Sequence, residues 1–167
     1  MRQILIEKYV KPSETKMEGT FFAECWFNEY GDLHSFLGHP AFIYYKNGVL
    51  TKQCWYKKGE KHRDNDFPAI IQYYKEKKDR QYWYKKGIMQ REKDLPSEIW
   101  YDSLGIETYK YWRNIYGELH GNKKHPSIIY YIQGEEISKS WHKNGVFIKE
   151  ENYLHETITY RKVYKTI

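Results

Sequence analysis

The side chains in this sequence best suited to chemistry are those of seven histidines and two cysteines. Imidazole and thiolate groups bind transition metals, and both also serve in nucleophilic and acid–base catalysis. Their spacing supports neither role, because the chain has no Cys-x-x-Cys and no His-x-x-x-His cluster. Three histidines instead share one position, three residues after a glycine: His34, His62 and His120. This recurrence predicts a repeated structural task, such as hydrogen bonding to a loop backbone, and no metal site or cofactor.

One tripeptide, His62-Arg63-Asp64, matches the start of a protein-kinase catalytic loop. An asparagine should follow it after four intervening residues, but Ala69 stands there, and the sequence has no glycine-rich phosphate loop. No Gly-x-Ser-x-Gly nucleophile motif is present either. We therefore expect no catalytic residues and a non-enzymatic protein.

A repeat indicates the elements that must position these residues. Five of the six tryptophans are separated by 29, 28, 29 and 29 residues: Trp26, Trp55, Trp83, Trp112 and Trp141. A proline follows each of the first four by thirteen or fourteen residues, and His155 takes the fifth place: Pro40, Pro68, Pro96 and Pro126. From that place the third residue is always isoleucine and the fifth always tyrosine: Ile43, Ile71, Ile99, Ile129, Ile158, and Tyr45, Tyr73, Tyr101, Tyr131, Tyr160. Such agreement indicates a repeated structural unit.

Each unit is predicted to be a β-hairpin. The segment around the tryptophan, such as residues 53–58, is typical of a short strand that ends at a turn glycine, and the proline then opens a second strand. Isoleucine (16 residues) and aromatic residues (6 Trp, 18 Tyr, 7 Phe) dominate, whereas the helix formers Ala (3) and Leu (8) are scarce. We expect an all-β fold, an elongated antiparallel array of five stacked hairpins. Residues 1–20 are expected to form an N-terminal capping segment, and residues 21–167 the array, as a single domain.

The second strand of each unit is expected to pack one face on a core. Positions one, three and five after the proline are small, isoleucine and tyrosine, as in Ala69, Ile71 and Tyr73, and a fixed residue type at alternate positions indicates a buried face. Cys25 and Cys54 hold equivalent positions in neighbouring units, about 9.5 Å apart if each unit contributes two strands. Because a disulfide needs Cα atoms within about 7 Å, we expect two free, buried thiols.

The motif that begins at Trp55 resembles MORN-like repeats. It reads Trp-Tyr-Lys-Lys-Gly-Glu-Lys-His-Arg and continues from Asp66 as Asp-Phe-Pro-Ala-Ile-Ile. It is similar to the 28–29-residue W-x-x-x-G-x-x-H-R…P-A-x-I-x-Y units of large DNA virus, phage and bacterial antitoxin-like proteins. The resemblance spans Trp26 to Tyr160, although the third and fifth copies lack the loop histidine and have Gln90 and Ile148. It implies a mostly non-catalytic scaffold for proteins, with membrane-lipid binding proposed for some members.

The other face of the second strand, two and four residues after the proline, varies between units. Its pairs are Phe42/Tyr44, Ile70/Gln72, Glu98/Trp100, Ile128/Tyr130 and Thr157/Thr159. A variable face rich in aromatic residues is typical of a protein-binding surface. The predicted partner-binding residues are Phe42, Tyr44, Ile70, Trp100, Ile128 and Tyr130. The alternative is that the capping segment or the curvature of the sheet covers this face.

Basic residues recur beside the turns. Lys57-Lys58 and Lys85-Lys86 flank the turn glycines, with Arg63 and Arg91 close by. Aligned in register, these six residues would form a ridge that could bind the phosphates of nucleic acid, a nucleotide or an anionic lipid. The alternative is a solvated edge that discourages aggregation, because acidic residues occupy the same loops: Asp64, Asp66, Glu92 and Asp94.

The N-terminus lacks the apolar run of a signal peptide, and no stretch of eighteen apolar residues occurs. We therefore expect a soluble protein of a reducing compartment, the cytoplasm, or the host cytoplasm if the chain is viral. The formal net charge of +6 permits an anionic partner without requiring one. The predicted function is a binding or scaffold module for a protein partner, in one version a viral or phage inhibitor of a host factor. Binding of nucleic acid, nucleotide or anionic lipid along the basic ridge is the alternative, and a homo-oligomer is left open.

Overall fold

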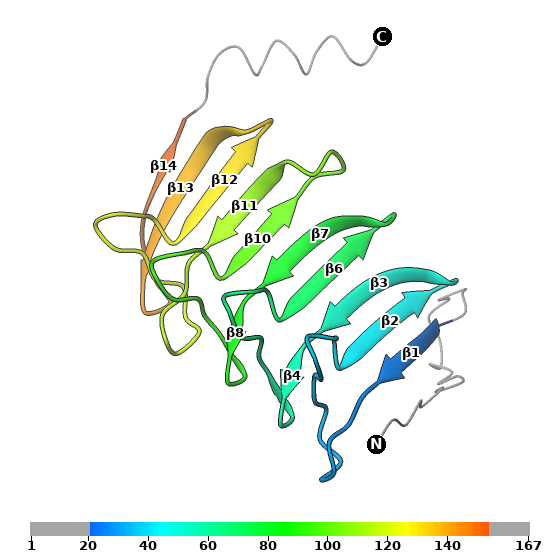
Figure 1. Cartoon of the computed structure of the whole chain (residues 1–167). Coiled ribbons are helices and arrows are strands. Elements are labelled where there is room, and N and C mark those ends of the chain that lie inside the picture. The colour runs from blue at the N-terminus through cyan, green and yellow to red at the C-terminus, as the bar shows by residue number, and fades with distance from the viewer. Residues whose placement is uncertain (1–20, 154–167) are drawn as a thin grey trace, which may run out of the picture.

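The computed structural model describes residues 21–153, which form fourteen β-strands and no helix (Figure 1). The all-β prediction is therefore confirmed. The strands are β1 (Phe21–Cys25), β2 (Phe42–Lys46), β3 (Val49–Cys54), β4 (Tyr56–Lys57), β5 (Glu60–Lys61), β6 (Ile70–Tyr74), β7 (Lys77–Tyr82), β8 (Tyr84–Lys85), β9 (Ile88–Met89), β10 (Glu98–Tyr101), β11 (Glu107–Tyr111), β12 (Ile128–Ile132), β13 (Glu135–Lys143) and β14 (Val146–Asn152).

Ten of these strands form one antiparallel sheet whose order follows the chain, β1-β2-β3-β6-β7-β10-β11-β12-β13-β14. The four short strands pair separately, β4 with β5 and β8 with β9, and lie beyond one end of the large sheet (Figure 1). The extensive contacts between strands are all between sheet neighbours. Within residues 21–153 the large sheet is thus a single layer.

The two-residue turns at the free end of the sheet require left-handed backbone. Asn47-Gly48 joins β2 to β3 with φ of 53° and 77°, values that Asn and Gly adopt at little cost. Lys75-Glu76 joins β6 to β7 with φ of 48° and 65°, although neither residue favours this region. The local sequence signal for a turn is therefore strong at Asn47-Gly48 and weak at Lys75-Glu76.

The chain leaves the large sheet at a tryptophan. The expected strand over residues 53–58 is in fact two strands, because β3 ends at Cys54 and β4 begins at Tyr56. Trp55 lies at this corner, and its backbone N–H donates to the carbonyl of Ala69 at 2.8 Å. Its indole N–H donates to the carbonyl of Gly38 at 2.8 Å, in the preceding loop. The same side-chain bond joins Trp83 to Asp66 (2.9 Å) and Trp112 to Asp94 (3.0 Å).

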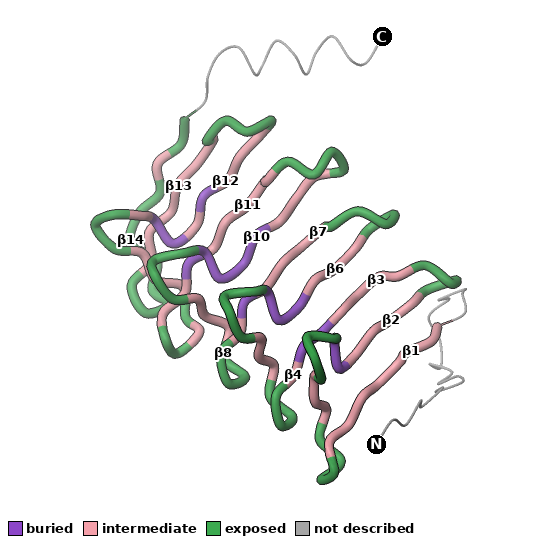
Figure 2. The backbone as a smooth tube through the Cα atoms, in the orientation of Figure 1, coloured by how far each residue is buried: buried purple, intermediate pink, exposed green. Residues whose placement is uncertain are grey.

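The buried residues gather at this tryptophan end of the sheet (Figure 2). Trp55, Trp83 and Trp112 are 5%, 7% and 8% exposed. The small residue that follows each of the four prolines has no exposed surface: Ala41, Ala69, Ser97 and Ser127. The backbone carbonyl of each of these small residues accepts the N–H of the preceding repeat tryptophan at 2.8–2.9 Å, so they lie at the corner where the chain leaves the sheet.

The prediction that one face of the second strand forms the core is confirmed only in part. On that face the small residues after the prolines have no exposed surface, and Ile99 and Ile129 are 7% and 6% exposed. Ile70 and Glu98 belong to the face expected to be open, yet they are only 5% and 6% exposed. Ile43 and Ile71 belong to the face expected to form the core, yet they are half-buried. Burial here depends both on distance from the tryptophan end and on the strand face, since Ile128 of β12 is half-buried whereas Ile129, on the opposite face, is buried.

The repeated histidines bond to loop backbone, as the sequence predicts. Nδ1 of His34 accepts the N–H of Lys58 at 3.2 Å, and Nδ1 of His62 accepts the N–H of Lys86 at 3.4 Å. Nδ1 of His120 accepts the N–H of Asn144 at 3.3 Å. In each case the partner lies 24 residues later, directly before a turn glycine. Residues 21–153 contain no group of three or more His, Cys, Asp or Glu side chains that could hold a metal ion.

Neither Cys25 nor Cys54 forms a disulfide, in agreement with the sequence prediction. In the register of the sheet Phe42 pairs with Cys25 on one side and with Cys54 on the other, so a strand separates the two thiols. Cys54 is buried and Cys25 half-buried. Burial raises the pKa of the Cys54 thiol, which keeps it protonated and unreactive. The expected capping segment, residues 1–20, and the isoleucine, tyrosine and variable pair of the fifth unit lie outside the described residues.

Candidate functional site

The strand register brings four large side chains into one row on one face of the sheet. Trp100 of β10 pairs with Arg80 of β7 and with Tyr109 of β11. Tyr109 in turn pairs with Tyr130 of β12. We call Arg80, Trp100, Tyr109 and Tyr130 the Trp100 row. Each of its members is half-buried, so part of each side chain is available to solvent or to a partner.

The rings of the Trp100 row are held by one another. The Arg80 guanidinium carbon lies 3.9 Å from the Trp100 ring centroid, a close cation–π contact. Trp100 meets Tyr109 edge-on at 5.3 Å between centroids, and Tyr109 stacks on Tyr130 at 4.6 Å. Aromatic pairs of this kind contribute about 0.5–1.5 kcal/mol each beyond the area that they bury. The row is therefore a preorganised surface rather than a set of loose side chains.

A buried carboxylate supports the row from the tryptophan end. Glu98 is 6% exposed, and its Oε1 accepts the indole N–H of Trp100 at 2.6 Å. Its Oε2 accepts a 3.0 Å bond from Nη2 of Arg113, so the buried charge has an ion-pair partner. Burial and then the Glu98 charge raise the pKa of the neighbouring Tyr111 to about 12. Glu98 thus fixes the orientation of the Trp100 indole and adds to the effect of burial on Tyr111.

The predicted partner-binding residues share this face but do not form one patch. Trp100 and Tyr130 belong to the Trp100 row. Ile128 lies two residues before Tyr130 in β12. Phe42 and Tyr44 form a separate stack on β2, with 6.2 Å between ring centroids. Lys52 of β3 and Gln72 of β6 lie in register between that stack and Arg80.

Ile70 cannot serve as a partner-binding residue, because only 5% of its surface is exposed. It pairs with Cys54 on β3 and with Tyr82 on β7, at the buried end of the sheet. For this reason Ile70 is inaccessible although it lies on the variable face.

Sequence reasoning missed Arg80 and Tyr109. It considered only the strand that follows each proline, whereas these two residues lie on the strands that precede Trp83 and Trp112. The alternating Tyr109-x-Tyr111 is the sequence signal that could have found one of them. Arg80 carries no such signal, because only the pairing of β7 with β10 places it against Trp100.

The opposite face has polar contacts between strands. The Tyr73 hydroxyl donates to Oε1 of Gln53 at 2.8 Å, and the Tyr101 hydroxyl donates to Oε1 of Gln81 at 2.6 Å. Farther along, the Lys110 ammonium lies 5.2 Å from the Tyr131 ring centroid. The recurring tyrosines therefore hold neighbouring units together, and the variable side chains of the molecule lie on the Trp100 face.

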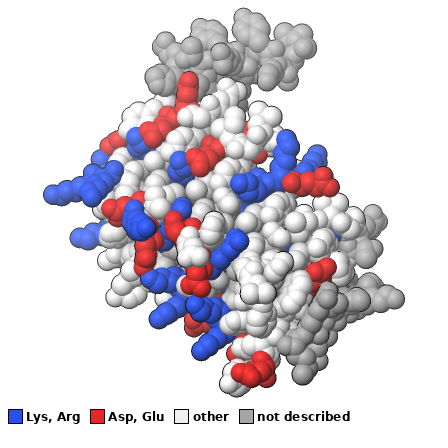
Figure 3. All heavy atoms as spheres, viewed as in Figure 1, with Lys and Arg blue, Asp and Glu red and all other residues white. Residues whose placement is uncertain are grey.

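The predicted basic ridge is largely neutralised by the acids of its own loops. Lys57 pairs with Asp64 at 3.2 Å, and Lys85 pairs with Glu92. Arg91 pairs with Asp66 at 2.8 Å. Figure 3 shows acidic and basic side chains intermixed over the loops instead of an uninterrupted basic surface.

The other three residues of the predicted ridge differ from one another. Lys58 and Lys86 are exposed, and their backbone N–H groups are the donors to His34 and His62. Arg63 stacks on Trp55 and has no ion pair among the described residues.

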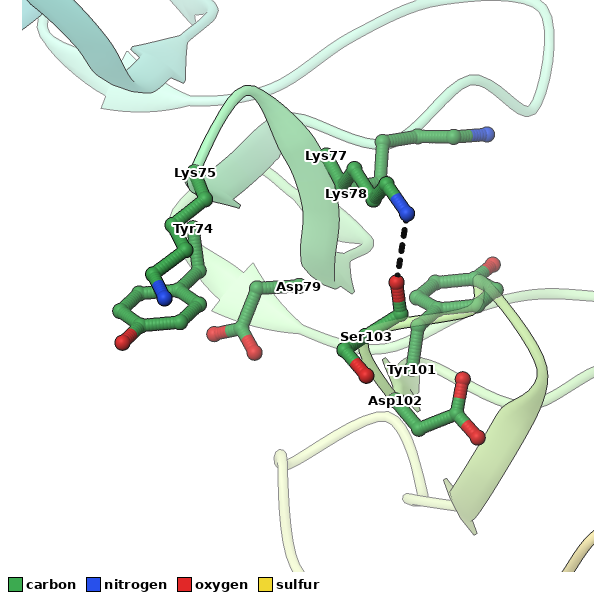
Figure 4. A pocket seen from close by; sticks show the side chains of 8 residues that line it. All are labelled: Tyr74, Lys75, Lys77, Lys78, Asp79, Tyr101, Asp102 and Ser103. Atoms are coloured by element: carbon green, nitrogen blue, oxygen red, sulfur yellow. Dashed lines mark hydrogen bonds between the residues drawn. The ribbon is translucent and has the colours of Figure 1, made fainter.

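A cavity of about 320 Å³ lies between the tips of the β6–β7 and β10–β11 hairpins (Figure 4). Lys77 reaches across it and donates a 2.8 Å hydrogen bond to the carbonyl of Ser103. The Lys78 ammonium lies 5.8 Å from the Tyr101 ring centroid. Both lysines contact the neighbouring hairpin tip and hold the two tips together. We therefore interpret the cavity as a structural contact between hairpins and not as a second candidate site.

No family model, no curated protein and no solved structure matches the chain. Residues 21–153 contain no helix with the length and apolarity that a membrane crossing requires.

Proposed function

We propose that the chain is a non-enzymatic binding module that engages a protein partner through the Trp100 row. The observation that carries this proposal is a row of four mutually fixed, half-buried side chains on a sheet face that no other described strand covers. Tryptophan, tyrosine and arginine are the residue types that dominate binding hot spots. Their fixed rings lose little conformational entropy on association, which favours affinity.

The finer architecture in this proposal is an array of five MORN-like hairpin units with a capping segment at residues 1–20. Its support is the recurrence of two contacts at the spacing of the sequence repeat. One is the indole bond of Trp55, Trp83 and Trp112 to the preceding loop. The other is the histidine bond to a loop N–H 24 residues later. An array of this kind suits a cytoplasmic scaffold, and in one version of the proposal a viral or phage chain occupies a host factor.

Adjacent tyrosines provide a matched test. Tyr130 belongs to the Trp100 row, whereas Tyr131 lies on the opposite face of the same strand. A photo-cross-linking phenylalanine analogue is placed at either position, and the protein is irradiated in an extract of its native source. The proposal expects a discrete protein adduct at position 130 that unlabelled protein competes away and Trp100→Ala reduces. Equal adducts at both positions, or none at position 130, would contradict it.

The salt dependence of the captured complex separates this proposal from binding along the basic ridge. A contact dominated by apolar and aromatic surface should change little between 50 and 200 mM salt. A protein that neutralises six to ten phosphates should lose about 10³–10⁵ in affinity over that range.

A further inference from the structure

Four of the five repeat tryptophans carry a basic side chain against the ring. The pairs are Arg63 on Trp55 (3.7 Å), Arg91 on Trp83 (4.0 Å), His125 on Trp112 (5.2 Å) and Lys149 on Trp141 (4.2 Å). Three of these basic groups have a carboxylate nearby: Asp66 for Arg91, Asp94 for His125 and Glu151 for Lys149. Arg63 alone makes no ion pair with a carboxylate among the described residues.

The Arg91 pair shows how a carboxylate fits such a site. Nη1 of Arg91 donates to the carbonyl of Pro96 at 3.4 Å, which fixes the guanidinium over Trp83. Nε and Nη2 then donate to the two carboxylate oxygens of Asp66, each at 2.8 Å. This is the bidentate arrangement in which arginine recognises carboxylates best. The bond to Arg91 holds the pKa of Asp66 below its usual value.

Arg63 is anchored in the same way but lacks the acid. Its Nη1 donates to the carbonyl of Pro68 at 3.3 Å, and the guanidinium carbon lies 3.7 Å from the Trp55 centroid. The residue at the place of Asp66 is Gly38, whose carbonyl accepts the Trp55 indole N–H as that of Asp66 accepts the Trp83 indole N–H. Nε and Nη2 of Arg63 therefore have no hydrogen-bond partner among residues 21–153.

The space beside Arg63 is open to a ligand. Arg63, Trp55 and Gly38 line a cavity of about 390 Å³. A Cβ atom built on Gly38 would meet nothing within 4 Å. Burial lowers the pKa of Arg63, which means that the site already bears part of the cost of removing this cation from water. An anion on Nε and Nη2 would offset that cost.

We infer that the Arg63 cavity is a binding site for a carboxylate group, such as the side chain of an acidic residue in a partner polypeptide. The ligand carboxylate takes the place that Asp66 takes at Arg91, bidentate on Nε and Nη2 of Arg63. The site uses none of the residues of the Trp100 row and stands independently of the proposed function.

The surroundings favour a carboxylate over a phosphate. Asp64 also lines the cavity, held by Lys57 at 3.2 Å and by Nε2 of His62 at 2.8 Å. Its charge disfavours a dianion more than a monoanion, and the planar Nε–Nη2 edge matches two carboxylate oxygens.

Nuclear magnetic resonance of the arginine Nε–H groups tests the inference directly. Sodium acetate is added to the full chain at constant ionic strength, with chloride replaced, and Arg63→Lys assigns the Arg63 signal. The Arg63 signal should shift and saturate with a dissociation constant on the order of 10 mM, the value expected for one charge-assisted pair. The Arg91 signal, whose site Asp66 already fills, should stay in place.

Two reciprocal substitutions sharpen the test. Gly38→Asp should place an internal carboxylate on Arg63, shift its signal before any ligand is added and abolish the acetate response. Asp at left-handed φ is already accommodated at position 66, where φ is 58°, against 80° at Gly38. Asp66→Gly should make Arg91 respond to acetate as Arg63 does in the unmodified protein.

Peptide binding distinguishes the two possible ligands, an acidic residue of a polypeptide and a small free carboxylate. The probes are capped Asn-Asp-Phe-Pro, which copies residues 65–68, and capped Asn-Asn-Phe-Pro as control. Tighter binding of the Asp peptide than of acetate assigns the site to acidic polypeptides, and equal binding assigns it to small carboxylates. A uniform drift of all arginine signals, an unchanged response in Gly38→Asp, or tighter binding of inorganic phosphate than of acetate would overturn the inference.

Discussion

The indole N–H of Trp83 donates a 2.9 Å hydrogen bond to the backbone carbonyl of Asp66, seventeen residues earlier in the chain. The same bond recurs at Trp55 and Trp112. Each tryptophan therefore ties its own corner of the sheet to the preceding loop while it fills the buried end of the strands. This one contact explains why the tryptophans recur with so little variation in spacing.

Replacing Trp83 with alanine should lower the free energy of unfolding by about 3–5 kcal/mol, because it removes a buried aromatic ring. Trp100→Ala should cost less, about 2 kcal/mol, since Trp100 is half-buried and loses its ring contacts with Arg80 and Tyr109 and one hydrogen bond. Urea unfolding followed by circular dichroism measures both values. Equal losses would contradict the distinction between core tryptophans and Trp100.

The Trp100 row should contain the binding hot spot. Tyr130→Ala should weaken the cross-linked partner by at least about 2 kcal/mol, the usual value for a hot-spot residue. Tyr131→Ala is the matched control, because it removes the same ring from the opposite face, and it should change affinity by less than about 0.6 kcal/mol, or threefold. Isothermal titration calorimetry on variants shown to be folded provides the comparison, and a larger effect at Tyr131 would place the interface on the other face.

Stability should fall at alkaline pH as Tyr111 ionises. Its pKa in the folded chain is about 12, against an ordinary value of 10.0, so the folded state holds this proton more tightly than the unfolded state does. The resulting stabilisation is complete below pH 10 and is lost as the pH rises toward 12, by about 2 kcal/mol. Urea unfolding at pH 9, 10 and 11 should show a shallower decline in Tyr111→Phe. An identical decline would show that Tyr111 does not contribute.

The Lys75-Glu76 turn should be improved by glycine. Glu76 has φ of 65°, a conformation that costs most side chains about 1–2 kcal/mol and that glycine adopts freely. After the extra entropy of glycine in the unfolded chain, Glu76→Gly should stabilise the protein by about 0.5–1 kcal/mol. Gly48→Ala, at φ of 77° in the corresponding turn between β2 and β3, should destabilise it. Thermal unfolding of both variants checks the opposite signs.

The His62 ring should protect a specific amide. His62→Ala removes the acceptor of the Lys86 N–H and one bond to Asp64, which should cost about 1–2 kcal/mol. Hydrogen exchange at the Lys86 amide should accelerate, whereas the Lys58 amide, bonded to His34, should be unaffected. His62→Asn, which returns an acceptor oxygen on a shorter side chain, should restore part of the protection. Faster exchange throughout the sheet would indicate a global rather than a local effect.

The strands were predictable because their signals are local. Pro68 and Pro96 were expected to be the first residues of their strands, and β6 and β10 begin two residues later, at Ile70 and Glu98. The backbone role of His34 and His62 followed from their shared position after a glycine. The break of the strand at Trp55 was not predictable, because residues 53–58 read Gln-Cys-Trp-Tyr-Lys-Lys and contain no Gly, Pro, Asn or Asp that would mark a turn.

The sequence by itself determined the all-β class, the turn at Asn47-Gly48 and the repeated role of the histidines, because each depends on residues close together in the chain or on their recurrence along it. Only the tertiary structure decided which side chains are accessible and which are paired. Ile70 and Trp100 lie on the same face, yet one is buried and the other half-buried, because burial depends on what neighbouring strands and loops cover. Arg91 has a carboxylate and Arg63 has none for the same reason, since the deciding residues, Asp66 and Gly38, lie 25 residues away and reach the guanidinium sites only when the units stack.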